Sequence, residues 1–461
     1  MTSNTSKHLN GLPVAQPGIG ELTAAIAEGR SSSRLLLEEA QRAHERHLDL
    51  NAIAHVDWPA AQARADRLDA LARAGSPLGA LHGIPLTIKD LYAVDGMPLA
   101  AGSRAQMPSL GASEAVAVAR LRAAGALIFA KTNMHEIALG ATGENAWTGD
   151  VKNPHDPARQ AGGSSSGAGV AVATGIGVAG LGSDTGGSVR IPAAFSGVVG
   201  FKPSFGAIPL AGALHLSWTC DHAGPLTRSV DDAARLFEVM SGRRTDHGAV
   251  PRRPRLAVPA KWLAPRMSHS MGAWFESVLA GLRKDADVID VEAPELFEAS
   301  AHYTAIVRAE AAYVHRDALA AGGSGFAPAV LAPLQAGLQV SVANYFDGMR
   351  QRDALRAELD AILRDYDALV LPTTGVPAPL RGQTEVQVAS GVMSTRDAVL
   401  GMTAPYSYVG LPTISLPCGQ VDGLPGSLQV VGARDHDAAL LALARWLEGL
   451  WSSSRGGLQY S

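Results

Sequence analysis

Cysteine is scarce in this chain of 461 residues, which contains only Cys220 and Cys418. Two thiols cannot build a disulfide framework or the four-ligand site of a structural zinc ion. Histidine, cysteine and acidic residues also show no metal-ligand spacing along the sequence. We therefore expect neither a bound metal nor another cofactor.

An excess of charge of one sign is also missing, as are long apolar runs. The formal net charge is −4 with both signs mixed along the chain. This pattern lacks the basic cluster that binding to nucleic acid or to a membrane surface would require. The least polar stretch, residues 167–182, consists mostly of Ala and Gly and is too weak to span a bilayer. The polar first residues lack the basic and apolar regions of a secretory signal, so a cytoplasmic location is expected.

Lysine is scarce as well, with seven residues against 32 arginines. Lys89, Lys131 and Lys202 each follow an apolar segment and are predicted to be buried, whereas the others have polar, turn-like or aromatic surroundings. Burial disfavours the ammonium form and can lower the pKa of a lysine by several units. A neutral Lys89 would act as a base; the alternative is a salt bridge with Asp90 or another acid.

The alternation of helical and strand-like segments predicts a layered α/β fold. Residues 1–75 are interpreted as a helical region, 76–245 as a core of alternating helices and buried strands, and 246–461 as the remainder of the same domain, with a connector near 242–255. Helices are predicted at 35–40, 60–74, 114–124, 268–282, 344–365 and 437–450. Strands are predicted at 84–88, 126–130, 198–201, 256–258, 368–371 and 413–416, the last two ending at proline.

Two glycine-rich turns, residues 162–167 and 183–188, carry serine. Glycine lets backbone N–H groups approach a ligand where larger side chains would block them. The four consecutive N–H groups of residues 185–188 can converge on one oxygen and form an oxyanion hole. A serine nucleophile needs a base, and because no histidine adjoins either turn, Lys89 is the candidate. A structural loop with solvated serines is the alternative on local sequence alone.

Two familiar motifs in this region receive other interpretations. Residues 175–180 match G-x-G-x-x-G, but residues 191–220 lack the acidic residue of a dinucleotide site, so close helix packing through small residues is favoured. Residues 163–167 match the nucleophile elbow G-x-S-x-G, with Ser165 at the centre. That elbow should follow a buried strand, whereas polar residues precede this one. An α/β-hydrolase esterase using Ser165 is the second chemical hypothesis.

Taken together, these residues resemble the amidase signature family. The match is strong over roughly residues 80–230 and returns at 410–412 and 417–419, while 245–400 carry little of it. The spacing of 24 residues between Ser164 and Ser188 also agrees with the family. The matching segments are Gly83-Ile84-Pro85 with Lys89-Asp90, Lys131-Thr132-Asn133-Met134-His135-Glu136, the two serine turns, Arg190 with Pro192-Ala193, and Gly200-Phe201-Lys202-Pro203.

The resemblance implies one large α/β domain with a central twisted mixed β-sheet covered by helices on both faces. It also implies a hydrolase that cleaves C–N bonds through an acyl-enzyme. Ser188 would be the nucleophile and Lys89 the base. Ser164, after a cis peptide bond from Gly163, would relay a proton from Ser188 to Lys89 and on to the leaving amine, after which water releases the acid. Further site residues are Thr185, Gly186 and Gly187 in the oxyanion hole, Asn133 and Met134 in the acyl pocket, and Asp184 and Arg190 as braces of the loop.

The family includes free-standing amidases, carbamate-opening enzymes and the amidotransferase subunit of tRNA-dependent synthesis. Residues 215–226 look more like the free-standing amidases. Residues 300–345 and 375–408, expected to surround the site, contain or adjoin several tyrosines, which favours a small aryl amide or anilide as substrate. A carbamate (urethane) is the close second, with ester hydrolysis as a side activity. The expected partners are this small molecule and water, without nucleic acid or membrane; a homodimer is compatible with the sequence. A non-catalytic or amidotransferase subunit of a larger complex is the alternative.

Overall fold

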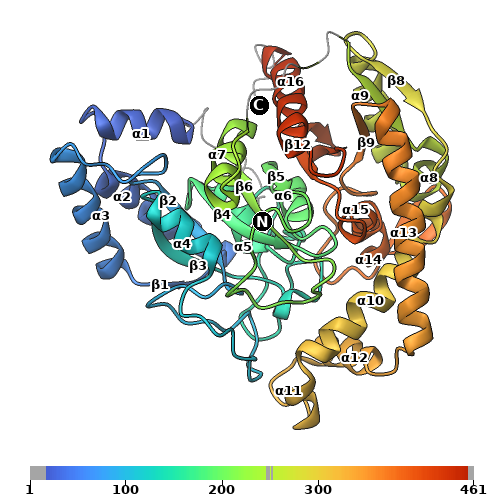
Figure 1. Ribbon diagram of the computed structural model, residues 1–461, viewed down its shortest axis with the longest axis horizontal. Helices are drawn as coiled ribbons and strands as arrows, with labels where there is room; N and C mark the ends of the chain where they lie inside the picture. Colours follow the sequence, from blue (N-terminus) through green and yellow to red (C-terminus); the bar gives the residue numbers. More distant parts are fainter. Residues whose placement is uncertain (1–16, 246–249, 251–252, 455–461) are drawn as a thin grey trace, which may run out of the picture.

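One mixed sheet of 11 strands, flanked by helices, organises the residues that the structure describes (Figure 1). The structure is a computed structural model, and it describes residues 17–245, 250 and 253–454. The strand order is β1-β3-β2-β4-β6-β5-β12-β13-β9-β7-β8, and a separate two-stranded sheet pairs β10 with β11. The predicted α/β class with a mixed central sheet is confirmed. The predicted division at residues 75 and 245 stays a prediction.

The strands of both sheets are short and come from most of the described chain. Their bounds are β1 Ile53–Val56, β2 Pro85–Lys89, β3 Leu127–Thr132, β4 Ala179–Asp184, β5 Val199–Lys202, β6 His222–Thr227, β7 Arg255–Val258, β8 Asp287–Asp290, β9 Ala368–Pro372, β10 Glu385–Val388, β11 Gly391–Ser394, β12 Thr413–Val421 and β13 Leu424–Val431.

Helices flank this sheet and extend beyond it at both ends (Figure 1). Their bounds are α1 Ile19–Ala27, α2 Ser33–Arg46, α3 Trp58–Arg73, α4 Val116–Ala123, α5 Ser166–Ala173, α6 Arg190–Ser196, α7 Val230–Ser241, α8 Ala260–Leu263, α9 His269–Leu282, α10 Ala299–Val314, α11 Arg316–Ala320, α12 Pro328–Gly337, α13 Val342–Asp365, α14 Thr395–Leu400, α15 Ala404–Tyr408 and α16 Asp437–Ser454. The helix α10 packs against both α12 and α13 at the side opposite α2 and α3.

Most predicted elements are confirmed, and the differences have local causes. A strand end was predicted at Pro417, but β12 continues beyond this residue. Its pairing with β13 is irregular between Pro417 and Gln420 and then resumes. Sheets tolerate proline at such bulges, so Pro417 does not end the strand. The segment 175–180 is a turn followed by the start of β4, not part of a helix. A Cβ on Gly180 would lie 3.1 Å from Thr87 Oγ1 and 3.2 Å from Ala168 Cβ. The small residues therefore bring β4 close to β2 and α5. The predicted connector near 242–255 lies partly outside the described residues.

The pairing of β2 places the serine turns beside Lys89. β2 is parallel to both β3 and β4, so the carboxyl ends of these strands meet at one edge of the sheet. Lys89 is the last residue of β2, and the turn 185–188 follows directly after β4. Helix α5, which begins at Ser166 after the first serine turn, packs on β2 and β4.

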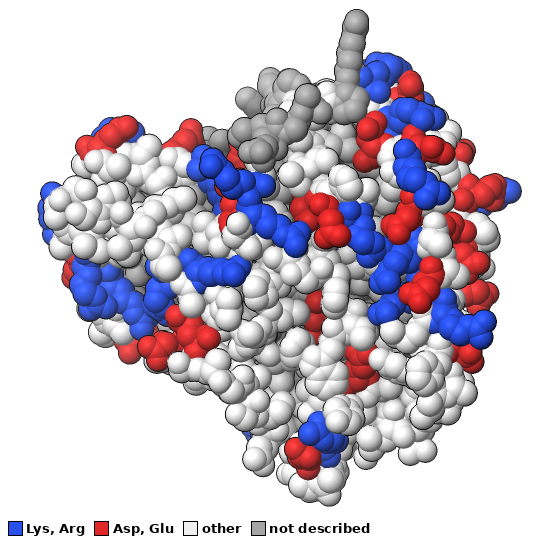
Figure 2. All heavy atoms as spheres, viewed as in Figure 1, with Lys and Arg blue, Asp and Glu red and all other residues white. Residues whose placement is uncertain are grey.

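Surface charge is mixed in sign, as the sequence predicted. Lysine and arginine lie interspersed with aspartate and glutamate over the face shown in Figure 2. Among the described residues, no helix combines the length and the apolar character that crossing a bilayer requires.

Candidate active site

Lys89 is buried at the end of β2 and faces two serine hydroxyls. Its Nζ donates hydrogen bonds to Ser164 Oγ at 2.7 Å and to Ser183 Oγ at 2.8 Å. Burial lowers the pKa of Lys89 from 10.5 to about 7, although the negative charges of Asp184 and Asp221 favour the ammonium form. A substantial fraction of this amine is therefore neutral near pH 7, and only a neutral amine can accept a proton.

The alternative interpretation of Lys89, a salt bridge with Asp90, is wrong. Asp90 pairs with Lys131 instead, with Nζ and Oδ1 2.9 Å apart and both side chains buried. Lys202 is buried as well, and its Nζ donates to the carbonyl oxygens of Pro203 and Leu411. All three lysines that were predicted to be buried are buried, and only Lys89 contacts the serine turns.

The first serine turn presents Ser164 to this amine. The peptide bond between Gly163 and Ser164 is cis, as the resemblance implied. The carbonyl oxygen of Ser164 accepts a hydrogen bond from the backbone N–H of His135 at 3.2 Å. This contact ties the turn to the segment after β3 and holds the hydroxyl of Ser164 at Lys89.

Ser188 lies beside the first turn and is 5% exposed. The backbone N–H of Ser165 donates to the carbonyl oxygen of Ser188 at 3.1 Å, so the two serine turns are neighbours. Within the part of the chain that the structure describes, no hydrogen bond joins the hydroxyls of Ser164 and Ser188. The structure therefore shows the contact of Lys89 with Ser164, while a contact between the hydroxyls of Ser164 and Ser188, and the catalytic roles of these residues, stay predictions.

The turn at residues 185–188, hereafter the oxyanion turn, has free donors and fixed acceptors. None of its four backbone N–H groups has an acceptor among the described residues. Three of its carbonyl oxygens are engaged: that of Gly186 accepts from Thr403 Oγ1 at 2.6 Å, that of Gly187 accepts from the N–H of Ile191 at 2.7 Å, and that of Ser188 accepts from the N–H of Ser165 at 3.1 Å. Donors held in place without partners are what an oxyanion hole requires.

Both glycines of the oxyanion turn are required by their surroundings. Gly187 has a φ of +145°, which side-chain-bearing residues rarely adopt. A Cβ on Gly186 would lie 2.1 Å from the hydroxyl oxygen of Tyr303, and one on Gly187 would lie 2.2 Å from Thr403 Oγ1. The sequence Gly-Gly therefore permits α10 and α15 to approach the turn closely.

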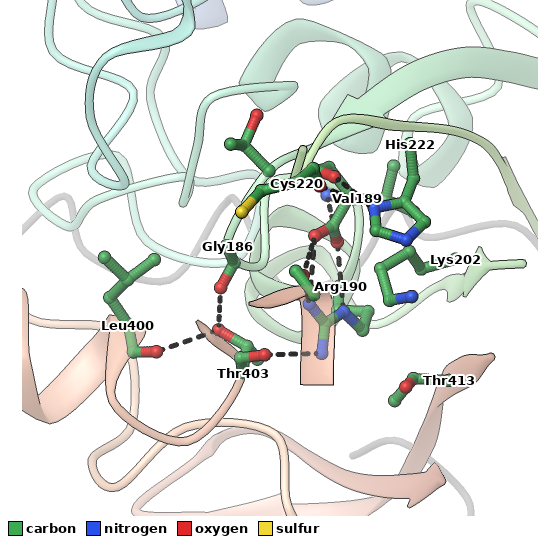
Figure 3. A network of polar contacts seen from close by, with 12 residues as sticks. Gly186, Val189, Arg190, Lys202, Cys220, His222, Leu400, Thr403 and Thr413 are labelled. Atoms are coloured by element: carbon green, nitrogen blue, oxygen red, sulfur yellow. Dashed lines mark hydrogen bonds and ion pairs between the residues drawn. The ribbon is translucent and has the colours of Figure 1, made fainter. Parts of the chain in front are cut away.

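Asp184 and Arg190 flank the oxyanion turn and form a buried, two-pronged ion pair. Arg190 donates to both carboxylate oxygens, at 2.9 and 3.0 Å, and also to Gln429 Oε1. It donates as well to the backbone oxygen of Thr403 (Figure 3). Burial alone would raise the pKa of Asp184, but the charge and hydrogen bonds of Arg190 hold it below its usual value. Ser407 Oγ also donates to Asp184. Residues 403, 407 and 429, hereafter the C-terminal clamp, thus fix the turn from outside.

Replacing Asp184 by asparagine is expected to destabilise the fold by about 3–5 kcal/mol, because it leaves the buried guanidinium of Arg190 without its counter-charge. Urea unfolding would measure the loss. The matched control is Asp317→Asn, because Asp317 is 93% exposed and lies 3.8 Å from Arg316; such surface pairs contribute little. Equal unfolding midpoints for the two variants would show that the buried pair does not hold this region.

Asn133 and Met134, predicted in the acyl pocket, follow β3 directly. The amide of Asn133 donates to the backbone oxygens of Asn51 and Gly149 and accepts from Thr148 Oγ1 and from the N–H of Met134. The amide group of Asn133 thus forms its hydrogen bonds with other residues of the protein. Met134 is fully buried in the main core cluster. A contact of either residue with substrate stays a prediction.

Ser165, the centre of the elbow motif, is placed differently from an exposed nucleophile. It is fully buried, its hydroxyl donates to the backbone oxygen of Ser183 at 3.1 Å, and it accepts from the N–H of Ser183 at 3.2 Å. The hydroxyl therefore joins the first turn to β4.

Several residues at the site were not assigned a role from sequence. Ser183 is the second acceptor of Lys89, and the parallel pairing of β2 with β4 is the signal that could have indicated it. Asp221 Oδ1 accepts from the Thr185 hydroxyl at 2.6 Å. Thr403 is 217 residues from Gly186, and no local pattern points to that contact.

A cavity of about 420 Å³ lies away from these groups. It is lined by Leu22, Leu36 and Pro85, among others. Pro85 begins β2, whereas Lys89 ends it. Its position at the opposite end of β2 separates it from Lys89 and the serine turns.

Comparison with known proteins identifies the family. A family model described as Amidase matches residues 34–441. A glutamyl-tRNA(Gln) amidotransferase subunit of Symbiobacterium thermophilum is 36% identical over 424 residues, covering 83% of this chain and 86% of the relative. A 1-carboxybiuret hydrolase subunit of Pseudomonas sp. strain ADP is 33% identical over 447 residues, covering 93% and 97%. A solved structure described as an amidase has a TM-score of 0.92 and 49% identity, covering 94% of this chain and 99% of that one.

The chain belongs to the amidase family, the amidase signature enzymes that the sequence motifs resembled. Members of this family are amide hydrolases and their relatives, which supports C–N bond chemistry for this chain. The two curated relatives described here are named as subunits, so neither tests whether this chain acts alone.

Proposed function

We propose that this chain is an amidase that forms an acyl-enzyme on Ser188. The observation that carries the proposal is the buried amine of Lys89, with a pKa of about 7, in contact with Ser164 beside an oxyanion turn with four free donors. A base, a relay and an anion-stabilising site are the three parts that a serine hydrolase needs.

In the first half-reaction, the oxygen of Ser188 attacks the carbonyl carbon of the amide. The proton of Ser188 passes to Ser164 while the proton of Ser164 passes to Lys89; the 2.7 Å contact of Lys89 with Ser164 is within proton-transfer reach. The negative carbonyl oxygen is stabilised by the N–H groups of the oxyanion turn. The proton then returns through Ser164 to the amide nitrogen, the C–N bond breaks, and the acyl group remains as an ester on Ser188.

In the second half-reaction, water attacks this ester and loses its proton along the same route. Collapse of the second tetrahedral intermediate breaks the ester bond, restores the hydroxyl of Ser188 and releases the carboxylic acid. In this scheme Lys89 and the N–H groups of the oxyanion turn serve both steps.

We propose a small aryl amide or anilide as the substrate, with a carbamate as the close second. Both present a carbonyl–nitrogen bond to Ser188, and a carbamate requires only room for one further ester oxygen. A panel of matched primary amides, anilides, esters and carbamates would rank these classes by kcat/KM.

The pH dependence of kcat/KM tests the role of Lys89. Because the neutral amine is the active form and its pKa is about 7, kcat/KM should rise tenfold per pH unit below pH 7 and level off above it. Initial-rate assays with p-nitroacetanilide from pH 5 to 9 would measure the curve. A flat profile across this range would remove Lys89 as the base.

A subunit role is the second candidate, because the two curated relatives named above are subunits. The purified chain alone should hydrolyse p-nitroacetanilide or a nitrophenyl carbamate if it acts by itself. Activity that arises only after a partner protein is added would favour the subunit role.

A further inference from the structure

A small cavity adjoins the catalytic groups and is walled by a histidine. The cavity has a volume of about 10 Å³, roughly one water molecule, and its lining includes Leu91, Ser183, Thr185 and His215. Ser183 contacts the amine of Lys89. The imidazole of His215 therefore lies at the edge of the catalytic site, although no step of the proposed reaction uses it.

Aromatic side chains continue from His215 to the surface. The ring centroids of His215 and Trp218 are 6.1 Å apart, and those of Trp218 and Tyr313 are 5.7 Å apart with planes at 68°. The guanidinium of Arg316 lies 4.4 Å from the ring centroid of Tyr313. Trp218 is 43% exposed and Tyr313 is 57% exposed, so part of each side chain lies outside the hydrophobic core and is accessible to a ligand. Exposed aromatic residues that adjoin a site are typical of ligand contacts.

Two carboxylates hold the loop that carries His215 and Trp218. Asp221 Oδ2 lies 3.1 Å from His215 Nδ1 and accepts from the N–H groups of Leu216 and Ser217, while its Oδ1 accepts from Thr185 in the oxyanion turn. One carboxylate thus fixes the loop relative to the oxyanion turn.

From the other side, Glu310 on α10 accepts from the hydroxyls of Ser217 and Thr219, at 2.6 and 2.9 Å, and from that of Tyr345 at 2.7 Å. Tyr313 lies on the same helix, one turn further along. Both rings are therefore attached to elements that are fixed relative to the catalytic groups. Such preorganisation lowers the entropic cost of binding a ligand.

We propose that Trp218 and Tyr313 form a binding surface for an aromatic ring of the substrate, with His215 at its inner end. The inference rests on the proposed function, because it assigns the ring-binding part of that same site. An aromatic ring suits this surface because edge-to-face and offset packing against indole and phenol is favourable. The surface adjoins the cavity at Ser183 through His215, which lines that cavity and contacts the ring of Trp218. An aliphatic chain of similar size would lack the ring-specific part of that interaction.

Three amide substrates separate the contributions. p-Nitroacetanilide carries its ring on the amine side, phenylacetamide carries it on the acyl side, and propionamide has none. Trp218→Leu should raise KM for at least one ring-bearing substrate about tenfold with a smaller change in kcat, and should lower its kcat/KM relative to propionamide about tenfold. Tyr313→Leu should act in the same direction with a smaller factor.

Phe297→Leu is the matched control. Phe297 is 48% exposed and, like Tyr313, lies under an arginine guanidinium, that of Arg266. It differs in that no ring contact among the described residues joins it to the series from His215 through Trp218 to Tyr313. This variant should keep the wild-type kcat/KM on all three substrates. Equal losses on propionamide and both ring-bearing amides in Trp218→Leu, or no loss on either ring-bearing amide, would overturn the proposal.

A binding measurement separates this proposal from the proposed function. If the wild-type chain hydrolyses none of the three amides, the proposed function fails, and calorimetric titration with phenylacetamide and with p-nitroacetanilide still tests the surface. On a Ser188→Ala background, Trp218→Leu should weaken the binding of at least one of these two ring-bearing amides about tenfold. Unchanged binding of both would overturn the aromatic surface whatever the outcome of the activity assays.

Discussion

Replacing Ser188 by alanine should lower kcat/KM for an amide by at least about 10⁴-fold, because the proposed acyl-enzyme cannot form without its oxygen. The oxyanion turn and substrate binding would remain and would account for the residual rate. Steady-state assays on p-nitroacetanilide measure the loss. Mass spectrometry of the wild-type protein quenched during turnover of an activated ester should find one acyl group, on Ser188, and none in the variant.

The control for this variant is Ser165→Ala, which separates the proposed site from the elbow hypothesis. Ser165 bridges the first turn to β4 through Ser183, so its loss should cost stability, about 1–3 kcal/mol, and leave much of the activity. A wild-type rate in Ser188→Ala together with an inactive Ser165→Ala would assign the nucleophile to the elbow.

Replacing Lys89 by methionine should lower kcat/KM by about 10²–10⁴-fold, the usual contribution of a general base, and should remove the rise of activity near pH 7. Methionine fills a similar volume and cannot accept a proton from Ser164. The matched variant is Lys89→Arg, which keeps a cation but cannot become neutral. Both variants should be equally impaired; a largely active Lys89→Arg enzyme would show that position 89 supplies charge and not a base.

The same substitution has a consequence for stability that carries a definite sign. The pKa of Lys89 is about 7 in the folded protein against 10.5 for the free side chain, so the unfolded chain binds one more proton between these values. Wild-type stability should therefore rise with pH in this window, by about 1.4 kcal/mol per pH unit from this group. Lys89→Met should lack that rise. Unfolding curves of both proteins at pH 7, 8 and 9 give the difference; parallel pH dependences would contradict the assigned pKa.

Local patterns in the sequence were sufficient for most elements but not for their arrangement. The apolar run before Lys89 predicted β2, and the glycine-serine pattern predicted a turn at residues 183–188, whose role as an oxyanion hole stays a prediction. The pairing of β5 with β12 joins residues about 210 positions apart, and no periodicity encodes such a partner. The C-terminal clamp escaped prediction for the same reason, because its members lie on segments that meet the turn only in three dimensions.

The alternation of side chains along a strand would have argued against a salt bridge between Lys89 and Asp90. Successive side chains of a strand point to opposite faces, so Lys89 at the end of β2 and the adjacent Asp90 were poor candidates for a pair. The partner of Asp90 is Lys131, which is paired with Ile88 across the parallel register of β2 and β3. By contrast, the side chain of Asn133 forms hydrogen bonds with residues 51 and 148–149. No sequence pattern near Asn133 predicts these partners.

The attachment of residues 403, 407 and 429 to the ion pair beside Ser188 limits how the chain can be divided. A fragment ending near residue 245 would retain every side chain of the proposed reaction, yet Arg190 would lose its contacts with Thr403, Ser407 and Gln429. The carbonyl oxygen of Gly186 would lose its contact with Thr403 as well. We therefore expect catalysis to require nearly the whole polypeptide, and two separately produced halves should regain activity only when they reassociate.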